Sequence, residues 1–349
     1  MSQKQNGGDG STNVQAAGEV AVTNNYGLSY RDAKEIALDI FNDNFLKLKN
    51  EAATIAEERA KEITGNFFEK LFEKNPQSIE GFKEPSAQEA LFNAQKEYAK
   101  SGDKNLESML VNILVDRMGE KERCLRSIVL DEALTIAPKL TQNQLNLITL
   151  TFLIYRCGIN ISNLPSFYAW LRKFSQFVTT EEPKNSDFIH IEYLRCGFVR
   201  AGNYKEIINS YLQNYSGLFA KGFLEAEIDE DTLAACKLAK ALTTNLRDSK
   251  KLQLHYLNLD ELESIHSQIA IDNDSSGKIK SLYQLNTMTP EEAKQDILAN
   301  CPEFEKALLL TENTQLRRME LTDTGIALAI ANYSRQTGDK LDLSIWIKD

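Results

Sequence analysis

The chain lacks the features that mark secreted and membrane-spanning proteins. Proline occurs only seven times in 349 residues, which favours long helices over a loop-rich fold. The five cysteines form no CxxC pair, so free thiols in a reducing compartment are expected. The most apolar window, 145–155, is too short to span a bilayer and predicts a buried helix, and residues 1–13 carry no apolar signal-peptide core. We therefore expect a cytoplasmic protein without a membrane span.

Positive charge is also scarce. The net charge is -10, with 40 Lys and Arg against 50 Asp and Glu. Because binding to phosphates needs a basic surface, this balance disfavours nucleic acid as a partner. The longest basic runs are the pairs Lys250-Lys251 and Arg317-Arg318, which are typical of solvated surface. Arg317 and Arg318 are retained as candidate contacts for an alternative in which the C-terminal region binds nucleic acid.

Recognised catalytic signatures are missing. The sequence contains no GxxxxGK[ST], GxGxxG or GxSxG motif. Its three histidines, His190, His255 and His266, occur at none of the spacings typical of metal ligands. We assign no catalytic residue, metal ligand or cofactor, and we favour a non-enzymatic role.

One segment resembles the start of a calcium-binding loop. Asp272-x-Asp274-x-Ser276-Gly277 has the spacing of the first loop ligands, but Tyr283 stands where a bidentate acid is required. We expect an acidic turn between helices at this segment.

The N-terminal arm, residues 1–28, combines glycine and asparagine with a period-two pattern. Alternation is a strand signal, and a single strand needs a partner edge for its backbone groups. The arm therefore either pairs with the body of its own chain or joins neighbouring subunits, and a tail without fixed structure is the alternative. We favour oligomerisation through one face of the strand, formed by Val14, Ala16, Gly18, Val20 and Val22.

The rest of the chain is predicted to be mainly α-helical, as a multi-helix bundle or array. Apolar residues at helical spacing after Ser29 predict one helix of about 35–45 residues. It opens a long-helix bundle domain at 29–160. An aromatic-rich helical domain at 161–270 follows, with a short helix predicted over Ser186–Val199.

A small C-terminal α+β unit is predicted at 271–349. The segments 315–321 and 340–347 alternate like strands on either side of a helix capped by Thr322. Antiparallel pairing of these two strands would give a winged-helix-like unit.

Several stretches resemble an uncharacterised bacterial family of helical proteins. They are GGDGSTNVQAAGEVAV at 7–22, GLSYRDAKEIALDIF at 27–41, a middle stretch at 90–118 and ELTDTGIALAIANYSRQTGDKLDLSIWI at 320–347. The family has a Gly-Asp-x-Ser-Thr-Asn-(Ile/Val)-Gln-Ala arm and a C-terminal Leu-Thr-x-x-Gly segment. The latter is also similar to the end of abortive-infection alpha proteins. The resemblance implies a role in bacterial defence and transfers no catalytic residue.

Three functions follow as hypotheses. The first is a non-enzymatic, oligomerising interaction protein of an anti-phage, abortive-infection type of defence, either a homo-oligomer or bound to a protein partner. The second is a regulator that binds nucleic acid through the winged-helix-like unit. The third is a cryptic hydrolase or nuclease, which requires histidines and carboxylates to converge in space.

Overall fold

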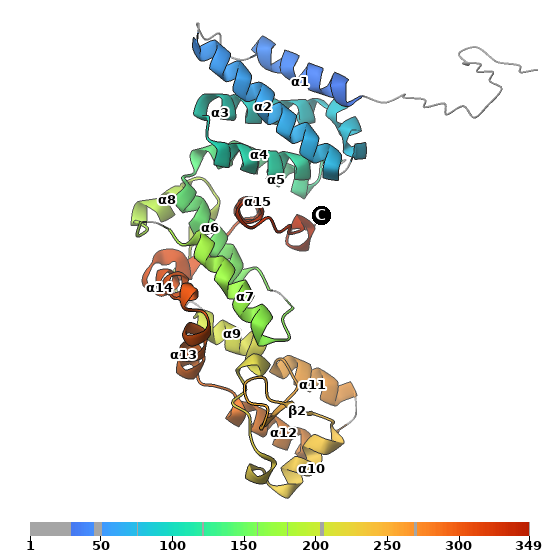
Figure 1. The fold of residues 1–349 in the computed structure, drawn as a ribbon, viewed down its shortest axis with the longest axis vertical. Helices are drawn as coiled ribbons and strands as arrows, with labels where there is room; N and C mark the ends of the chain where they lie inside the picture. The colour runs from blue at the N-terminus through green and yellow to red at the C-terminus, as the bar shows by residue number, and fades with distance from the viewer. Residues whose placement is uncertain are drawn as a thin grey trace, which may run out of the picture.

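The protein is an elongated stack of helices. The computed structural model describes residues 29–44, 51–74, 76–120, 122–158, 160–179, 181–202, 206–268 and 271–348. Figure 1 shows three parts along the longest axis: a helical end, a middle part that contains both α6 and α15, and a small lobe at the opposite end. The expectation of a mainly helical protein is confirmed. Within the described part of the chain, no helix is long and apolar enough to cross a membrane.

The helical end contains two helices where the sequence predicted one long one. Its elements are α1 (Tyr30–Asn44), α2 (Glu51–Lys74), η1 (Pro76–Lys83), α3 (Pro85–Ser101), α4 (Lys104–Arg117) and α5 (Leu125–Ile136). A continuous helix would separate Tyr30 from Phe68 by about 57 Å, yet their ring centroids are 5.8 Å apart. Phe41 shares a buried cluster with Ala56 and Ala60, so α1 and α2 run antiparallel. The single long helix was wrong because both helices carry an apolar stripe of the same period.

The middle part continues the same hydrophobic core. Its elements are η2 (Ala137–Lys139), α6 (Gln142–Tyr155), α7 (Leu164–Phe174), η3 (Ser175–Phe177), α8 (Asn185–Tyr193), α9 (Ile207–Tyr215), η4 (Ser216–Phe219), α13 (Pro290–Asn300), η6 (Pro302–Phe304), α14 (Glu305–Asn313), η7 (Gln315–Arg318), α15 (Asp323–Thr337) and η8 (Leu343–Ile345). One cluster of buried side chains runs from Ala33 to Ile347. We call the helical end and the middle part together the body.

Helix α6 is the most buried helix of the body, as its apolar sequence predicted. Every residue from Gln144 to Ile154 is buried. Thr141 caps it, and Gln144 completes the capping box. Helix α15, capped by Thr322 as expected, packs against α6, α5 and α4. The central helix pair therefore consists of segments almost 200 positions apart in the chain.

The predicted C-terminal strand pair was wrong. Residues Gln315–Arg318 form η7, and only Met319–Leu321 are a strand, β4. This strand pairs antiparallel with β1 (Gly197–Val199), with Phe198 opposite Glu320. In the second predicted strand, Leu343–Ile345 form η8, and Trp346 donates its indole N–H to the Arg156 carbonyl at 2.8 Å. Leu343 and Ile347 thus pack in the core of the body without a strand partner, whereas Ile345 is 62% exposed. The predicted sheet of the winged-helix-like unit is therefore not formed by these two segments.

The small lobe, residues 220–287, has a core of its own. It contains η5 (Glu225–Glu227), α10 (Glu230–Leu238), β2 (Leu242–Thr244), β3 (Leu252–Leu254), α11 (Leu259–Gln268) and α12 (Asn273–Asn286). Strands β2 and β3 form an antiparallel hairpin. The core of this lobe holds eleven buried residues, which include Ile279, Leu282 and Tyr283 of α12.

The segment that resembles a calcium-binding loop forms the start of helix α12. The expectation of an acidic turn between helices was wrong. Asp272 is its N-cap, and its carboxylate accepts the Ser275 N–H at 2.9 Å. Gly277 lies inside the helix and has no positive φ. The acidic residues that resembled loop ligands therefore stabilise the N-terminus of a helix.

Candidate functional site

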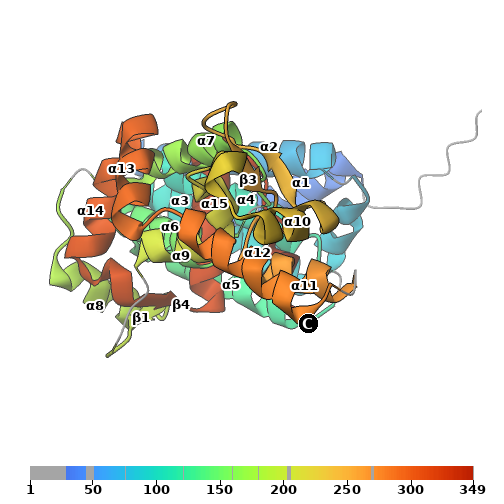
Figure 2. The ribbon, with the colours of Figure 1, turned by 90° about the horizontal axis from the view of Figure 1, so that it is seen from below.

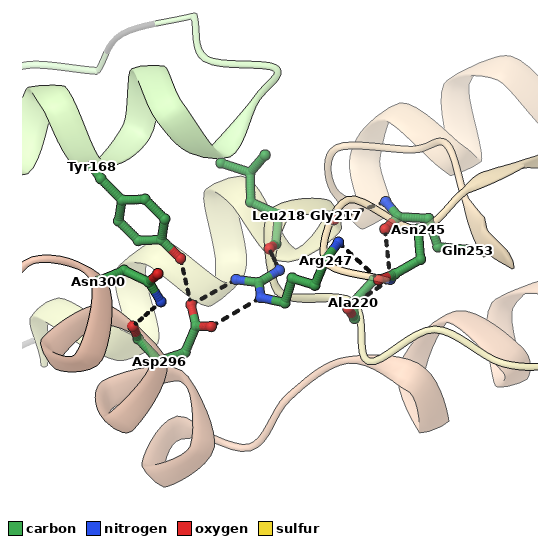
Figure 3. A network of polar contacts seen from close by, with 9 residues as sticks. All are labelled: Tyr168, Gly217, Leu218, Ala220, Asn245, Arg247, Gln253, Asp296 and Asn300. Atoms are coloured by element: carbon green, nitrogen blue, oxygen red, sulfur yellow. Dashed lines mark hydrogen bonds and ion pairs between the residues drawn. The ribbon is translucent and has the colours of Figure 1, made fainter. Parts of the chain in front are cut away.

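The small lobe meets the body at a network of buried polar side chains (Figure 3). Arg247 follows β2, whereas Asp296 lies on α13 of the body. The Arg247 guanidinium donates two hydrogen bonds to the Asp296 carboxylate, from Nε to Oδ1 at 2.9 Å and from Nη2 to Oδ2 at 2.6 Å. Tyr168 of α7 donates its hydroxyl to Oδ2 at 2.7 Å. We call Tyr168, Asn245, Arg247, Gln253 and Asp296 the junction network.

Burial strengthens this ion pair. The two side chains are 19% and 15% exposed. Burial alone would raise the pKa of Asp296, but hydrogen bonds from Arg247 and Tyr168 hold it below its ordinary value. Burial likewise raises the pKa of Tyr168, and the bonded carboxylate raises it further. The pair is therefore charged at neutral pH, while the tyrosine keeps its proton.

Two amides extend the junction network into the small lobe. Asn245 Nδ2 donates to Gln253 Oε1 at 2.9 Å and to the Ala220 carbonyl at 3.1 Å. Gln253 Nε2 donates to the Gly217 carbonyl at 3.1 Å. Arg247 also donates to the Leu218 carbonyl. Since these donors and acceptors satisfy one another, the network acts as a structural clamp between lobe and body.

The three histidines do not converge. His266 lies in the small lobe, with Nε2 2.9 Å from the Tyr256 hydroxyl and Nδ1 3.0 Å from the Ser276 hydroxyl. His190 Nδ1 lies 3.0 Å from Gln144 Oε1 on the body. The His255 ring lies next to that of Tyr256, with 4.3 Å between ring centroids and an angle of 40° between their planes. The partners of His190 and His266 are thus hydroxyls and an amide, whereas the hydrolase hypothesis called for carboxylates.

A different site forms on the two-stranded sheet β1–β4, beside α8 (Figure 2). The Arg200 amide donates to the Arg318 carbonyl at 3.0 Å, which places these residues opposite each other. Side chains two positions apart share one face of a strand. Arg200 therefore lies on the same face as Phe198 and as Glu320, which is opposite Phe198, whereas Arg318 is the last residue of η7 and borders this face.

The other face of this sheet packs on the body, since Met319 and Leu321 are only 5% and 3% exposed. The face that carries Phe198 and Arg200 points outward. Phe198 is 41% exposed, and the Arg200 guanidinium lies 5.6 Å from its ring centroid. Glu320 bridges Arg200 and Arg156, whose Nη2 lies 3.4 Å from Oε1. We call this surface the arginine face.

Two further arginines border the arginine face. Arg195 ends the turn between α8 and β1 and has a left-handed backbone with φ of 58°. Its carbonyl accepts the Thr322 hydroxyl at 2.6 Å, next to the end of β4. Arg317 precedes Arg318 in η7 and donates to the Glu312 carbonyl at 3.3 Å. Of the five arginines gathered here, Arg317 and Arg318 are the pair that the sequence predicts as candidate contacts. Arg156, Arg195 and Arg200 are isolated in the sequence, and no local pattern marks them.

The predicted oligomerisation residues, Val14 to Val22, lie outside the described residues. Among the described residues, no group of three or more His, Cys, Asp or Glu side chains could hold a metal ion. The described residues form a mainly helical protein with two large cores and a small third cluster around Phe41, and the arginine face is its most distinctive solvent-facing site.

A protein-family model whose description reads only “-like” matches residues 27–347, and the chain belongs to that family. The match spans nearly the whole chain, as expected for the uncharacterised family that the sequence resembles. Its description assigns no activity. No curated protein and no solved structure matches the chain.

Proposed function

We propose that the chain is a non-enzymatic helical interaction protein that self-associates through its N-terminal arm. An exposed aromatic pair at the base of the arm carries the proposal. Tyr30, directly after the first described residue, is 38% exposed, and Phe72 of α2 is 53% exposed. Their ring centroids are 6.4 Å apart. Aromatic rings contribute large buried areas at interfaces, so this pair extends the predicted pairing strand with an apolar contact surface.

Light scattering coupled to size exclusion tests this proposal. The full chain, with a protomer mass of 39.4 kDa, is expected to form an oligomer whose mass rises with concentration. The chain of residues 29–349 keeps every described element and is expected to approach the protomer mass. Equal, monomeric masses for both chains contradict the proposal.

Point variants test the contribution of the aromatic pair to association separately from that of the arm. Phe72→Ser removes half of the exposed pair and is expected to weaken association, whereas the arm stays intact. Leu285→Ser is the matched control, because Leu285 is 78% exposed at the opposite end of the molecule. Weakening by both variants alike would show that general surface apolarity, rather than the base of the arm, drives association.

The resemblance to abortive-infection proteins supports a proposed role in bacterial anti-phage defence. Phage challenge of cells that carry or lack the gene tests that role. Equal phage yields in both strains would contradict the proposed defence role.

Nucleic-acid binding is a second candidate function, favoured by the arginine face. It no longer relies on a winged-helix-like unit, because β4 pairs with β1 and not with the C-terminal segment.

A further inference from the structure

Folding concentrates positive charge on one surface of an acidic protein. The whole chain has a net charge of -10. On and around the arginine face, five arginines lie near four carboxylates, Glu192, Glu312, Glu320 and Asp323, and Glu312 is itself paired with Lys294. The arginines are Arg156, Arg195, Arg200, Arg317 and Arg318. A polyanion would therefore be attracted to this surface and repelled by most of the remainder.

Three of these arginines, Arg156, Arg195 and Arg200, have exposed side chains, whereas the Nε atom of Arg318 is buried. The Arg200 side chain is 64% exposed and that of Arg156 is 42% exposed. Both guanidiniums bond to Glu320, which is 31% exposed. A carboxylate held between two arginines shows that the site accommodates an anionic oxygen, and guanidinium forks match phosphate geometry equally well.

Exposed aromatic rings accompany the arginines. Phe198 stands on the arginine face beside Arg200. Tyr193, the last residue of α8, is 80% exposed and precedes Arg195 by two positions. Aromatic rings next to a basic track are typical of single-strand binding, because unstacked bases can lie on them. A duplex hides its base faces and would use the arginines alone.

We propose that the arginine face binds the backbone of single-stranded nucleic acid, with Arg156, Arg195 and Arg200 contacting phosphates and Phe198 stacking on a base. Glu320 occupies two of these arginines in the free protein and competes with phosphate. This binding does not depend on self-association through the arm, so either proposal can fail without the other.

The backbone of Arg195 adds a separate argument. A left-handed conformation is unfavourable for a residue with a Cβ, whereas glycine adopts it freely. Arg195 therefore places a charged side chain at a backbone position where glycine would be more favourable for folding. Arg195→Gly should leave the fold at least as stable and weaken binding, which a purely structural residue would not do.

Fluorescence anisotropy with labelled single-stranded DNA and RNA of about 20 nucleotides tests the proposal on the full chain. Three phosphate contacts predict that log K falls with log salt at a slope of about -2 between about 50 and 200 mM. Arg200→Gln should weaken binding and reduce the slope by about 0.7. Phe198→Ala should weaken binding at least about fivefold, with an unchanged slope.

Two variants make the result decisive. Glu320→Gln removes the competing carboxylate and should tighten binding, in the direction opposite to Arg200→Gln. Arg31→Gln makes the same charge change on the exposed side of α1 and should leave affinity unchanged. Thermal melting of each variant separates lost binding from lost folding.

The proposal is overturned if the intact protein binds no single strand at low salt. It is equally overturned if Arg200→Gln and Arg31→Gln have the same effect, since binding would then lie elsewhere. Duplex DNA bound as tightly as single strands, with Phe198→Ala silent, would rule out the stacking role.

Discussion

The body and the small lobe are held together by different means. The body has one continuous core that reaches from Ala33 to Ile347, and its central helix α6 is buried along eleven consecutive residues. The small lobe relies on a core of eleven side chains. A domain of so few residues buries too little apolar surface to be more than marginally stable. Its contacts with the body combine the junction network with a buried bond between the Tyr283 and Ser216 hydroxyls and the packing of Leu257 on the body core. Polar contacts therefore have a larger share there than within the body.

The body also contains a buried polar contact, but one of a different kind. Asn332 of α15 is fully buried and donates to Thr149 of α6 at 2.8 Å. Both groups are neutral and lie inside one core. The junction network, in contrast, places a charged pair between two cores. Loss of a charge there leaves its partner buried and unpaired, which is the more costly defect.

The largest expected effect is therefore at the junction. Asp296→Ala leaves the Arg247 guanidinium buried without its carboxylate and should lower the free energy of unfolding by about 3–5 kcal/mol. Hydrogen exchange should show faster exchange across the small lobe than in α6 and α15. Glu292→Ala, on the same helix, removes an exposed pair with Lys221 together with the capping-box bond to the Thr289 N–H, and should cost only about 1 kcal/mol.

A double variant tests the role of the charged pair by removing both of its charges together. Asp296→Leu with Arg247→Met replaces the charged pair with apolar side chains and should recover much of the stability. Equal loss in Asp296→Ala and Glu292→Ala would show that the junction network does not hold the lobe.

The same substitution should have opposite signs in the two regions. A Cβ added to Gly325, at the start of α15, would lie 1.8 Å from the Cys196 carbonyl oxygen. Gly325→Ala must displace β1 from α15 and should destabilise the body by about 1–3 kcal/mol. Gly277, inside α12, has nothing within 4 Å of its added Cβ, so Gly277→Ala should stabilise the small lobe by about 0.5–1 kcal/mol.

Urea unfolding followed by circular dichroism measures both variants. A destabilising Gly277→Ala would mean that this residue needs a conformation closed to alanine, as in a calcium loop. A neutral Gly325→Ala would mean that β1 is loosely held.

Local sequence patterns predicted the helix boundaries best where a cap defines them. Thr322 caps the helix that the sequence assigned to it, and Thr141 and Thr289 cap α6 and α13 in the same way. The failures concern pairing at long range. Apolar periodicity is the same on both sides of the α1–α2 connection, so it could not reveal the reversal. The predicted helix Ser186–Val199 ends at Tyr193, because residues 197–199 form a strand with β4, more than 100 positions away.

The candidate site was only partly predictable for the same reason. Arg317 and Arg318 are neighbours in the sequence, but Arg156, Arg195 and Arg200 join them only through folding. A charge total for residues 271–349 misses this surface, because three of its arginines come from other segments. The register of β1 on β4 is what brings Arg200 opposite Arg318.

The smallest expected effect is a dependence of stability on pH that is confined to the small lobe. Burial, with a further contribution from nearby His255, lowers the pKa of His266 below its ordinary value of about 6.5. The imidazole is bonded to Tyr256 and Ser276 and stays neutral in the folded lobe. As the pH falls below about 6.5, the unfolded chain takes up a proton that the folded lobe does not, so stability decreases until the pH reaches the folded pKa.

Each unit by which the folded pKa is depressed corresponds to about 1.4 kcal/mol of stability lost at low pH. Amide exchange in α11 and α12 should therefore accelerate between about pH 7.5 and 5.5, after correction for intrinsic rates, while α6 stays protected. His266→Gln should make the lobe less stable but remove this dependence, whereas the exposed His255→Gln should retain most of it. A pH response that persists in His266→Gln would place the titrating group elsewhere, and an equal response in α6 would mean that lobe and body open as one unit.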